Sequence, residues 1–308
     1  YGSVDELIGQ TRPDVVIVAT PPAAHLEPCL RAIEAGCHVF CEKPLAQSVA
    51  EADRILAAAR AGGRLVAVNQ EFREHPIFRA IREQIASARF GRLAFCQVWQ
   101  LMDLPPWKEP TRWRADMANR ALFEGGIHLV DLLIWIFGAQ AAAVSAQFSA
   151  GFHERQDSDA IQLVTVEFPG GRLGQVTVDR LCRAGTRYLE VRADCEEASL
   201  RASFGGRATA RVGIKRAEPL GALMEFGYSG LAWAEQGRSR KTLARNPPEA
   251  AVVGSTRLLE GLVAAIDRGG EPPSSALEAR HVLAVIEAAY ESGRTGRRVE
   301  LSGREIPV

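Results

Sequence analysis

Three short apolar segments alternate with helical patterns in the first 70 residues, and this arrangement constrains the fold most strongly. Residues 14–19, 38–41 and 65–68 are almost entirely apolar. Apolar runs of this length are typical of parallel strands that helices cover on both faces. Strands that alternate with helices favour an α/β architecture. The sequence therefore predicts a Rossmann-type, doubly wound parallel sheet over residues 1–90.

A Gly-rich turn is missing from this predicted sheet. A dinucleotide-binding fold begins with a strand, a Gly-rich turn and a helix whose N-terminus binds the pyrophosphate. No GxGxxG sequence follows a predicted strand here. We therefore expect that the first βαβ unit and the next helix, about 50–60 residues, precede this sequence in a longer gene product. The alternative is a natural protein that has lost dinucleotide binding.

The pattern changes after about residue 90. Residues 161–168 and 172–178 are alternating segments joined by a Pro-Gly-Gly turn, which predicts a β-hairpin. Other strands are predicted at residues 93–101, 188–193, 198–203 and 208–212, and helices at 255–267 and 277–292. Residues 238–241 are predicted to form a solvated loop. We expect residues 91–308 to form a second domain for substrate binding and oligomerisation. It would be built on a large, mostly antiparallel open sheet, with the last helices packing back on the first domain.

Charge and cysteine content exclude several classes of protein. Lys plus Arg and Asp plus Glu both number 37, so no net charge attracts nucleic acid or an anionic membrane surface. No segment has the roughly 18 consecutive apolar residues of a membrane span. The six cysteines form no CxxC pair, which favours reduced thiols and a cytoplasmic location. We expect neither a nucleic-acid partner nor a membrane.

The first candidate motif, Thr20-Pro21-Pro22 with His25, follows the first predicted strand. In open α/β sheets, ligands bind outside the carboxyl ends of the strands. Thr20 and the loop backbone could therefore bind the ribose or phosphate groups of a nucleotide. The alternative is an ordinary turn with proline near the start of a helix.

The second motif, Glu42-Lys43-Pro44, follows the next strand and is expected at the same edge of the sheet. A lysine at this position can exchange a proton with a substrate hydroxyl beside a nicotinamide ring. The alternative is a surface Glu-Lys pair that precedes a turn.

The third motif begins an apolar segment that predicts a buried helix ending at Gly138. Glu124 and His128 are four residues apart and share a helix face, and Asp131 lies three residues further on. A carboxylate beside a neutral imidazole can set its tautomer and make it a better base. One alternative is a buried histidine bonded by Asp131. A metal site would need a third protein ligand, and the other histidines are scattered.

In this order the motifs resemble the Gfo/Idh/MocA (glucose–fructose oxidoreductase and inositol dehydrogenase-like) family over essentially the whole chain, with the first unit absent. The first motif resembles the loop after the family's fourth strand, and Glu42-Lys43-Pro44 resembles its EKP signature. Residues 69–73 resemble the segment after the next strand, residues 113–114 and 124–131 the region of the catalytic helix, and residues 293–299 the C-terminal tail.

The resemblance implies roles for individual residues. Lys43 corresponds to the EKP lysine, His128 to the histidine of the family's DxxxH pair, and Glu124 stands where that pair has Asp. Lys43, His128 and Glu124 are thus the expected catalytic residues. The expected cofactor-binding residues are Thr20, Pro21, Pro22, His25, Glu42 and Lys43. The expected substrate-binding residues are Asn69, Arg73, Trp113, Arg114, Lys43 and His128. No metal ligands are expected.

The activity implied by the resemblance is hydride transfer between NAD or NADP and a secondary alcohol of a sugar, an inositol or a related polyol. His128 or Lys43 takes the hydroxyl proton, the other donates a hydrogen bond, and Glu124 orients one of them. A homodimer or homotetramer through the second-domain sheet is expected. Two alternatives are an NAD-dependent glycosidase of the same fold and a non-catalytic NAD(P)- or sugar-binding regulatory protein.

Overall fold

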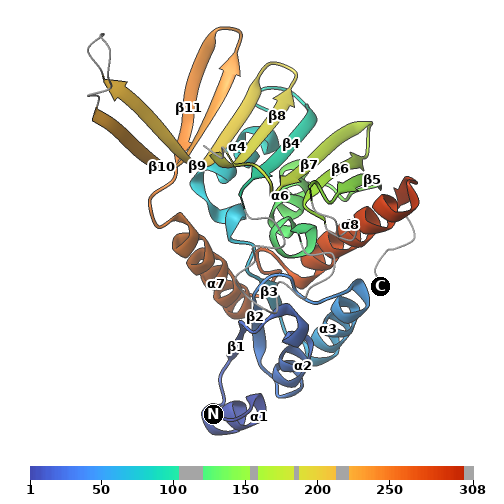
Figure 1. Ribbon diagram of the computed structural model, residues 1–308. Helices are drawn as coiled ribbons and strands as arrows, with labels where there is room; N and C mark the ends of the chain where they lie inside the picture. Colours follow the sequence, from blue (N-terminus) through green and yellow to red (C-terminus); the bar gives the residue numbers. More distant parts are fainter. Residues whose placement is uncertain (104–120, 153–158, 184–186, 213–221, 302–308) are drawn as a thin grey trace.

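A three-stranded parallel sheet forms the first layer of the protein (Figure 1). The computed structural model describes residues 1–103, 121–152, 159–183, 187–212 and 222–301. The strands are β1 (Val15–Val18), β2 (His38–Cys41) and β3 (Val66–Val68), hydrogen-bonded in the order β1-β2-β3. The three predicted strands and their parallel arrangement are therefore confirmed. β1 is an edge strand, and Ile17 on it is 59% exposed.

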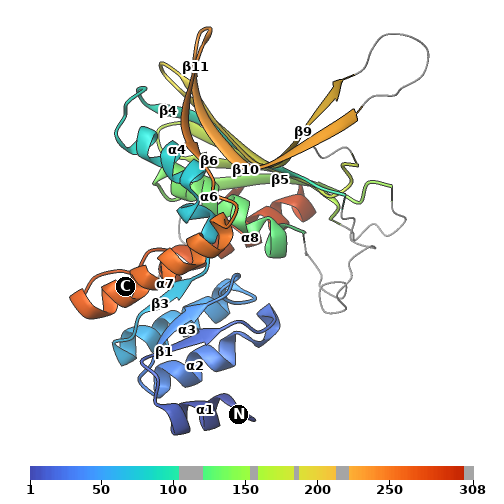
Figure 2. The same ribbon diagram turned by 90° about the vertical axis from the view of Figure 1, so that its left-hand side faces the viewer.

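Helices cover both faces of this sheet (Figure 2). The helices around it are α1 (Val4–Thr11), α2 (Leu26–Glu34), α3 (Val49–Gly62), α7 (Ala250–Arg268) and α8 (Ala276–Thr295). On one face α2 contacts β1, β2 and α3. On the other face, Leu258 and Leu262 of α7 pack against Phe40 and Ala67 of the sheet. This two-sided cover explains why the strands are almost entirely apolar.

Short polar residues and glycines set the ends of these helices. The side chain of Ser48 accepts a hydrogen bond from the backbone N–H of Glu51 at the start of α3. Ser275 and Glu278 form a reciprocal capping box at the start of α8. Gly63 ends α3 with a φ of 61°, a left-handed conformation that costs glycine little. These caps satisfy backbone groups that have no partner within the helix.

A nine-stranded sheet forms the second layer, in the order β11-β10-β9-β8-β4-β7-β6-β5-β12. Its strands are β4 (Leu93–Leu101), β5 (Ala143–Ser149), β6 (Ile161–Phe168), β7 (Arg172–Asp179), β8 (Arg187–Cys195), β9 (Ser199–Val212), β10 (Ala222–Gln236), β11 (Ser239–Arg245) and β12 (Val299–Glu300). All neighbouring pairs are antiparallel except β4 and β7. The predicted hairpin and the mostly antiparallel sheet are confirmed.

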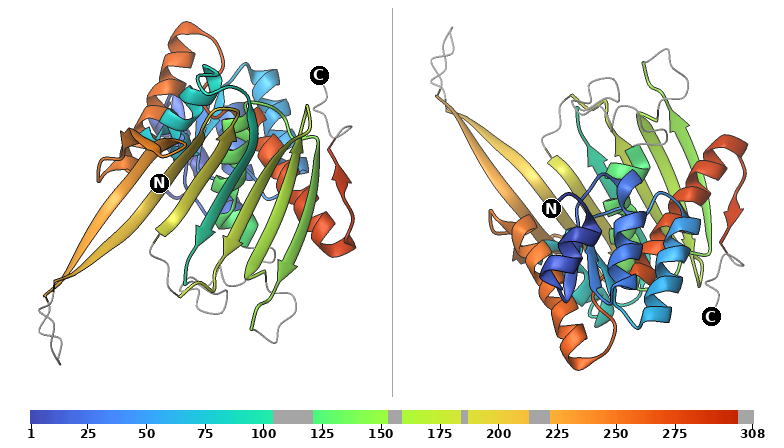
Figure 3. Two further views of the ribbon diagram at one scale, coloured as in Figure 1. Left: turned by 90° about the horizontal axis from the view of Figure 1, so that it is seen from above. Right: turned by 90° about the horizontal axis from the view of Figure 1, so that it is seen from below.

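Within the described ranges, helices pack on one face of the large sheet only, and the other is called the open face below. They are α4 (Pro76–Ala86), α6 (Ile127–Phe137) and α8. Seen from above, the strands lie in front of these helices (Figure 3, left). α8 contacts β5 in the large sheet, and it also contacts β3 of the small sheet and the helix α3 beside it. It therefore links the two layers. On the open face, Leu163 and Leu173 are 43% and 44% exposed.

Two predictions about this sheet are wrong. The strands expected at 198–203 and 208–212 are one strand, β9, which continues through Gly205 at a φ of 65°. A glycine inside a strand permits such a local irregularity, although in the sequence it breaks the strand pattern. Residues 238–241, expected to be a loop, include the start of β11, which pairs with β10. Charged side chains are common on an edge strand, so no apolar alternation marks it.

The described residues include no helix that is both long and apolar enough to cross a lipid bilayer.

Candidate active site

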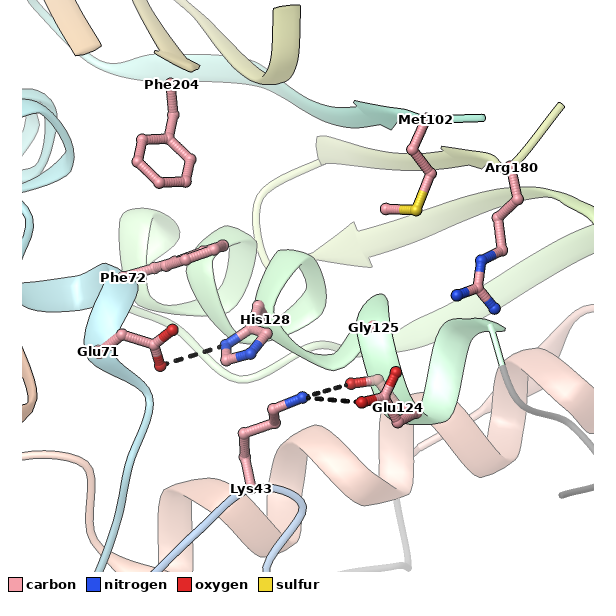
Figure 4. A pocket seen from close by; sticks show the side chains of 9 residues that line it. All are labelled: Lys43, Glu71, Phe72, Met102, Glu124, Gly125, His128, Arg180 and Phe204. Carbon is pink, nitrogen blue, oxygen red and sulfur yellow. Dashed lines mark hydrogen bonds and ion pairs between the residues drawn. The ribbon is translucent and has the colours of Figure 1, made fainter. Parts of the chain in front are cut away.

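A cavity of about 310 Å³ opens between the two layers, where the loops after β2 and β3 meet the start of α6 (Figure 4). It is lined by Lys43, Glu71, Phe72, Met102, Glu124, Gly125, His128, Arg180 and Phe204. The carboxyl ends of parallel strands meet at one edge of a sheet, which brings the loops after β2 and β3 together. All three residues expected to be catalytic line this one cavity.

Lys43 comes from the loop after β2, and Glu124 from a π-helical turn, η4 (Ala121–Gly125), that precedes α6. The Nζ atom of Lys43 donates a hydrogen bond to the backbone carbonyl of Glu124 at 2.8 Å and lies 3.5 Å from its Oε1 atom. Single π-helical turns occur frequently at functional sites. Here the turn places both the carbonyl and the carboxylate of Glu124 against the lysine.

His128 lies in the first turn of α6, buried under the ring of Phe72. The two rings are stacked, with centroids 4.7 Å apart and planes inclined by 29°. Burial, followed by the charges of Lys43 and His75, lowers the pKa of His128 well below its ordinary value. The imidazole is therefore neutral near pH 7 and able to accept a proton.

Glu71 comes from η2 (Glu71–Glu74), a short 3-10 helix that follows β3. Its Oε2 atom lies 3.7 Å from Nδ1 of His128. Burial raises the pKa of the Glu71 carboxyl to about 7, although Lys43 opposes this shift. Glu71 therefore changes charge close to neutral pH, at the wall of the cavity.

Asp131 contacts Arg73 instead of His128. Arg73 donates from Nε to Oδ2 of Asp131 at 2.8 Å and from Nη2 to Oδ1 at 2.6 Å, and its Nη1 bonds to Glu278 at 3.0 Å. The interpretation of His128 as a histidine bonded by Asp131 is therefore wrong. The expected substrate contact of Arg73 also needs correction, because its side chain is only 5% exposed and its guanidinium is held by these carboxylates.

The loop after β1 carries the expected cofactor-binding residues. The Thr20 hydroxyl, which is exposed, donates to the carbonyl of Ala24 at 3.0 Å. Pro21 precedes a short 3-10 helix, η1 (Pro22–Ala24). His25 lies buried beneath the loop, with Nε2 at 2.7 Å from the carbonyl of Thr20 and Nδ1 at 2.7 Å from that of Pro44. His25 thus joins the loops after β1 and β2, a supporting position beneath the expected cofactor surface.

Asn69 and Glu42 join the ends of β3 and β2. The Asn69 amide donates to Oε1 of Glu42 at 2.8 Å, and Asn69 is buried. Asn69, expected to bind substrate, therefore lies beside the cavity and holds Glu42. The remaining expected substrate residues, Trp113 and Arg114, lie outside the described residues.

Two family models match this chain in succession. Residues 1–70 match the model of an oxidoreductase family with an NAD-binding Rossmann fold, and residues 78–201 match the Gfo/Idh/MocA C-terminal domain. Together they cover more than half of the chain, in the order that the two layers follow. The chain belongs to the Gfo/Idh/MocA family. The resemblance found in the sequence is confirmed.

Relatives within the Gfo/Idh/MocA family include named sugar enzymes. The chain is 34% identical over 175 residues to a 1,5-anhydro-D-fructose reductase of Ensifer adhaerens, across 56% of this chain and 52% of that protein. It therefore matches only about half of the length of that relative. It is 26% identical over 316 residues to a D-apiose dehydrogenase of Paraburkholderia graminis, across 99% of this chain and 77% of that protein.

A solved structure shows the same fold. An oxidoreductase from Agrobacterium radiobacter, in complex with NAD+, L-tartaric acid and magnesium, superposes with a TM-score of 0.81 at 18% identity. The match covers 99% of this chain and 85% of that one. The arrangement of a small parallel sheet followed by a large, mostly antiparallel sheet is thus shared across weakly similar sequences.

Sequence reasoning missed several residues that line the cavity of this Gfo/Idh/MocA protein, namely Glu71, Phe72, Met102, Arg180 and Phe204. The position of Glu71 in the sequence could have indicated its place in the site, because a carboxylate soon after a buried strand is expected at the ligand-binding edge. Arg180 follows β7, and Phe204 lies within β9. Both approach from the large sheet, so only the packing of the two layers reveals them.

The edge of the small sheet fits a nucleotide cofactor of the Gfo/Idh/MocA type. Among the described residues, Oδ1 of Asn69 and both amide atoms of Gln70 are buried without a hydrogen-bond partner. Buried polar atoms are almost always bonded, so such atoms at a strand end offer unused donors and acceptors to a ligand. Within the same residues, no group of three or more His, Cys, Asp and Glu side chains could hold a metal ion.

Proposed function

We propose that the protein is an NAD(P)-dependent oxidoreductase that acts on a secondary alcohol of a sugar, an inositol or a related polyol. The main support is that Lys43, from the small sheet, and His128, from α6, line the same cavity at the carboxyl ends of β2 and β3. The named reductase and dehydrogenase relatives act on sugars, which supports this class of substrate.

The chain supplies a proton acceptor and a hydrogen-bond donor to this reaction. When bound, nicotinamide supplies the hydride acceptor or donor. The neutral His128 takes the hydroxyl proton at Nε2, the ring nitrogen that faces the side of Lys43 in Figure 4. Lys43, oriented by Glu124, donates a hydrogen bond to the same oxygen as negative charge develops on it.

Cofactor binding is proposed for the loops after β1 and β2. Thr20, Pro21 and Pro22 would contact the cofactor directly, together with Glu42 and Lys43. His25 and Asn69 would act beneath this surface, because their hydrogen bonds fix the loops on which the contacting residues lie. The proposed cofactor is NAD or NADP. Trp113 and Arg114 remain proposed substrate residues on the basis of the family resemblance alone.

The test combines a substrate screen with one substitution. The full-length protein is screened against sugars and inositols with NAD and with NADP, and turnover is followed by the absorbance of reduced nicotinamide. His128→Ala is expected to lower turnover about a hundredfold or more while cofactor affinity is retained, because the proton acceptor is lost. Unchanged turnover in this variant would remove His128 from the mechanism. Release of a sugar leaving group without net reduced cofactor would instead indicate a glycosidase, and binding without turnover a regulatory protein.

We also propose that two copies pair through the open face of the large sheet. Leu163 on β6 and Leu173 on β7 are exposed on this face, and exposed apolar patches often mark contact surfaces. Light scattering is expected to show at least a dimer, and the double substitution Leu163→Glu/Leu173→Glu to give a monomer. Val252→Glu, on the similarly exposed α7 surface, is the control and should not change the mass. A monomeric wild-type protein would contradict this proposal.

A cytoplasmic location is part of the same proposal. All six cysteines are free thiols, and free thiols are typical of proteins kept in a reducing compartment.

A further inference from the structure

His128 has a buried ring nitrogen that makes no hydrogen bond. Among the described residues, its Nδ1 atom is buried and has no hydrogen-bond partner. The Oε2 atom of Glu71 lies 3.7 Å from it. This is longer than a hydrogen bond, and the hydrogen bonds of catalytic pairs are often long until a ligand binds. The stacked ring of Phe72 fixes the imidazole plane, so that Nδ1 faces Glu71 and Nε2 faces the side of Lys43 (Figure 4).

The other two carboxylates expected to act on His128 are engaged elsewhere. Glu124 lies against Lys43, which contacts both its carbonyl and its Oε1 atom. Asp131 accepts two hydrogen bonds from Arg73. Of the carboxylates near His128 in the described part of the chain, Glu71 is the one directed at its Nδ1 atom.

We propose that Glu71 is a positioning residue that selects the tautomer of His128 and thereby the direction in which this site handles protons. As a carboxylate, Glu71 accepts a hydrogen bond from Nδ1–H. This leaves the lone pair of Nε2 to take the hydroxyl proton when an alcohol is oxidised. As a carboxylic acid, Glu71 donates to Nδ1, and Nε2–H then donates its proton to a carbonyl oxygen that is being reduced. The proposal rests on the proposed function, in which the cofactor takes or gives the hydride.

Contacts of the neighbouring backbone and side chains hold Glu71 and His128 at a fixed position relative to each other. α7 packs so closely on η2 that a Cβ atom on Gly254 would lie 2.6 Å from the carbonyl oxygen of Glu71. Two residues after Glu71, Arg73 is anchored to Asp131 on α6, the helix that carries His128. The element that carries Glu71 is therefore packed against α7 and bonded to α6, which carries His128, as a positioning role requires.

The surrounding charges allow Glu71 to change its protonation state, and His128 its tautomer, near neutral pH. Burial raises the pKa of Glu71 to about 7, with Lys43 lowering it and Glu42 and Asp131 raising it. Glu71 is thus protonated below about pH 7 and charged above it. His128 stays neutral throughout this window because burial, and then Lys43 and His75, lower its pKa.

The other charged groups around the pair contact one another or lie across the cavity. Arg73 is bonded to Asp131 and Glu278, and Glu124 lies against Lys43. Arg180, on the large sheet, lines the far side of the same cavity. Glu71 lines the cavity, and burial raises its pKa to about 7.

The direct test measures the tautomer of the His128 imidazole in the absence of cofactor and substrate. Long-range proton–nitrogen NMR of the uniformly nitrogen-labelled chain resolves the tautomers of its six histidines, and His128→Gln assigns the signal of interest. The expected result is Nε2–H below about pH 7 and Nδ1–H above it in the wild type, following Glu71. Glu71→Gln should give one tautomer at every pH, because an amide does not titrate.

A matched control and a conservative variant keep this test decisive. Glu74→Gln alters another carboxylate of η2, one that pairs with Arg79, and should leave the tautomer switch unchanged. Glu71→Asp keeps the charge with a shorter reach, so it should keep a titrating tautomer even if Glu71→Gln does not fold. A His128 tautomer that titrates identically in Glu71→Gln and wild type would overturn the proposal, as would a wild-type tautomer that does not change with pH.

Kinetics then separate this inference from the proposed function. In the active full-length enzyme, Glu71→Gln should lower kcat for oxidation above pH 7 by about tenfold to a hundredfold and flatten its pH profile, with KM little changed. A wild type that oxidises no polyol but shows the NMR switch would refute the proposed function alone. An active enzyme whose pH profile is unaffected by Glu71→Gln would refute the role of Glu71 alone.

Discussion

Replacement of Lys43 by methionine is expected to lower turnover about a thousandfold, within the usual range for loss of an acid–base group. Methionine keeps most of the apolar stem but has no charge and no donor. The Glu124 carbonyl, now 2.8 Å from Nζ, would lose its hydrogen bond, and a mostly buried carboxylate would lose its cation. The substrate oxygen would lose the donor that stabilises developing negative charge. Single-turnover measurement of hydride transfer is the appropriate readout, since it excludes product release.

Two variants show whether this loss comes from the site itself. Lys43→Arg keeps the charge but presents it on a planar fork of different reach, so only part of the activity should return. Lys241→Met, on the exposed β11, removes a lysine far from the cavity and should leave turnover unchanged. Because Lys43 lowers the pKa values of both Glu71 and His128, its removal should raise both and move the tautomer switch to higher pH. Wild-type turnover in Lys43→Met would exclude Lys43 from catalysis.

The sequence predicts the strand ends well, because the physical cause is local. A buried parallel strand must be apolar throughout, and the first polar residues after it lie at the ligand-binding edge. That reasoning places Thr20, Glu42 and Lys43 correctly at this edge of the sheet. The same reasoning applies to Glu71, although the family resemblance assigns a role to its neighbours Asn69 and Arg73 instead.

The choice of partners in the site could not be predicted from spacing. Helical periodicity places Asp131 one turn from His128, and this is correct for the backbone. Its side chain instead meets Arg73, which is 58 residues away in the sequence, because a buried guanidinium needs a carboxylate more than a neutral imidazole does. Glu124 meets Lys43 through a π-helical turn that no residue pattern marks. The partners of Asp131 and Glu124 are therefore set by charged groups that are distant in the sequence, which local sequence patterns do not show.

Removal of the Asp131 carboxylate is expected to destabilise the fold by about 3–5 kcal/mol, since Asp131→Ala leaves the buried Arg73 with an uncompensated charge. The two side chains are 2% and 5% exposed, so water cannot replace the lost partner. Glu278 is half-exposed and binds Arg73 through one nitrogen only, so it offsets little of this loss. Urea denaturation measures the change as a shift in the midpoint at constant slope.

Two further variants show whether the destabilisation in Asp131→Ala comes from an unpaired buried charge or from the loss of a contact. Glu74→Ala breaks the partly exposed pair with Arg79 and should cost at most about 1 kcal/mol. The double substitution Arg73→Met/Asp131→Leu removes both charges and should recover most of the stability lost in Asp131→Ala. If Asp131→Ala lowered the free energy of unfolding no more than Glu74→Ala does, the Arg73–Asp131 ion pair would not hold η2 against α6.

The double variant Arg73→Met/Asp131→Leu also tests the role of this ion pair in positioning Glu71. It should fold stably yet hold Glu71 less firmly against His128, so its tautomer switch should weaken while its melting behaviour stays near that of the wild type.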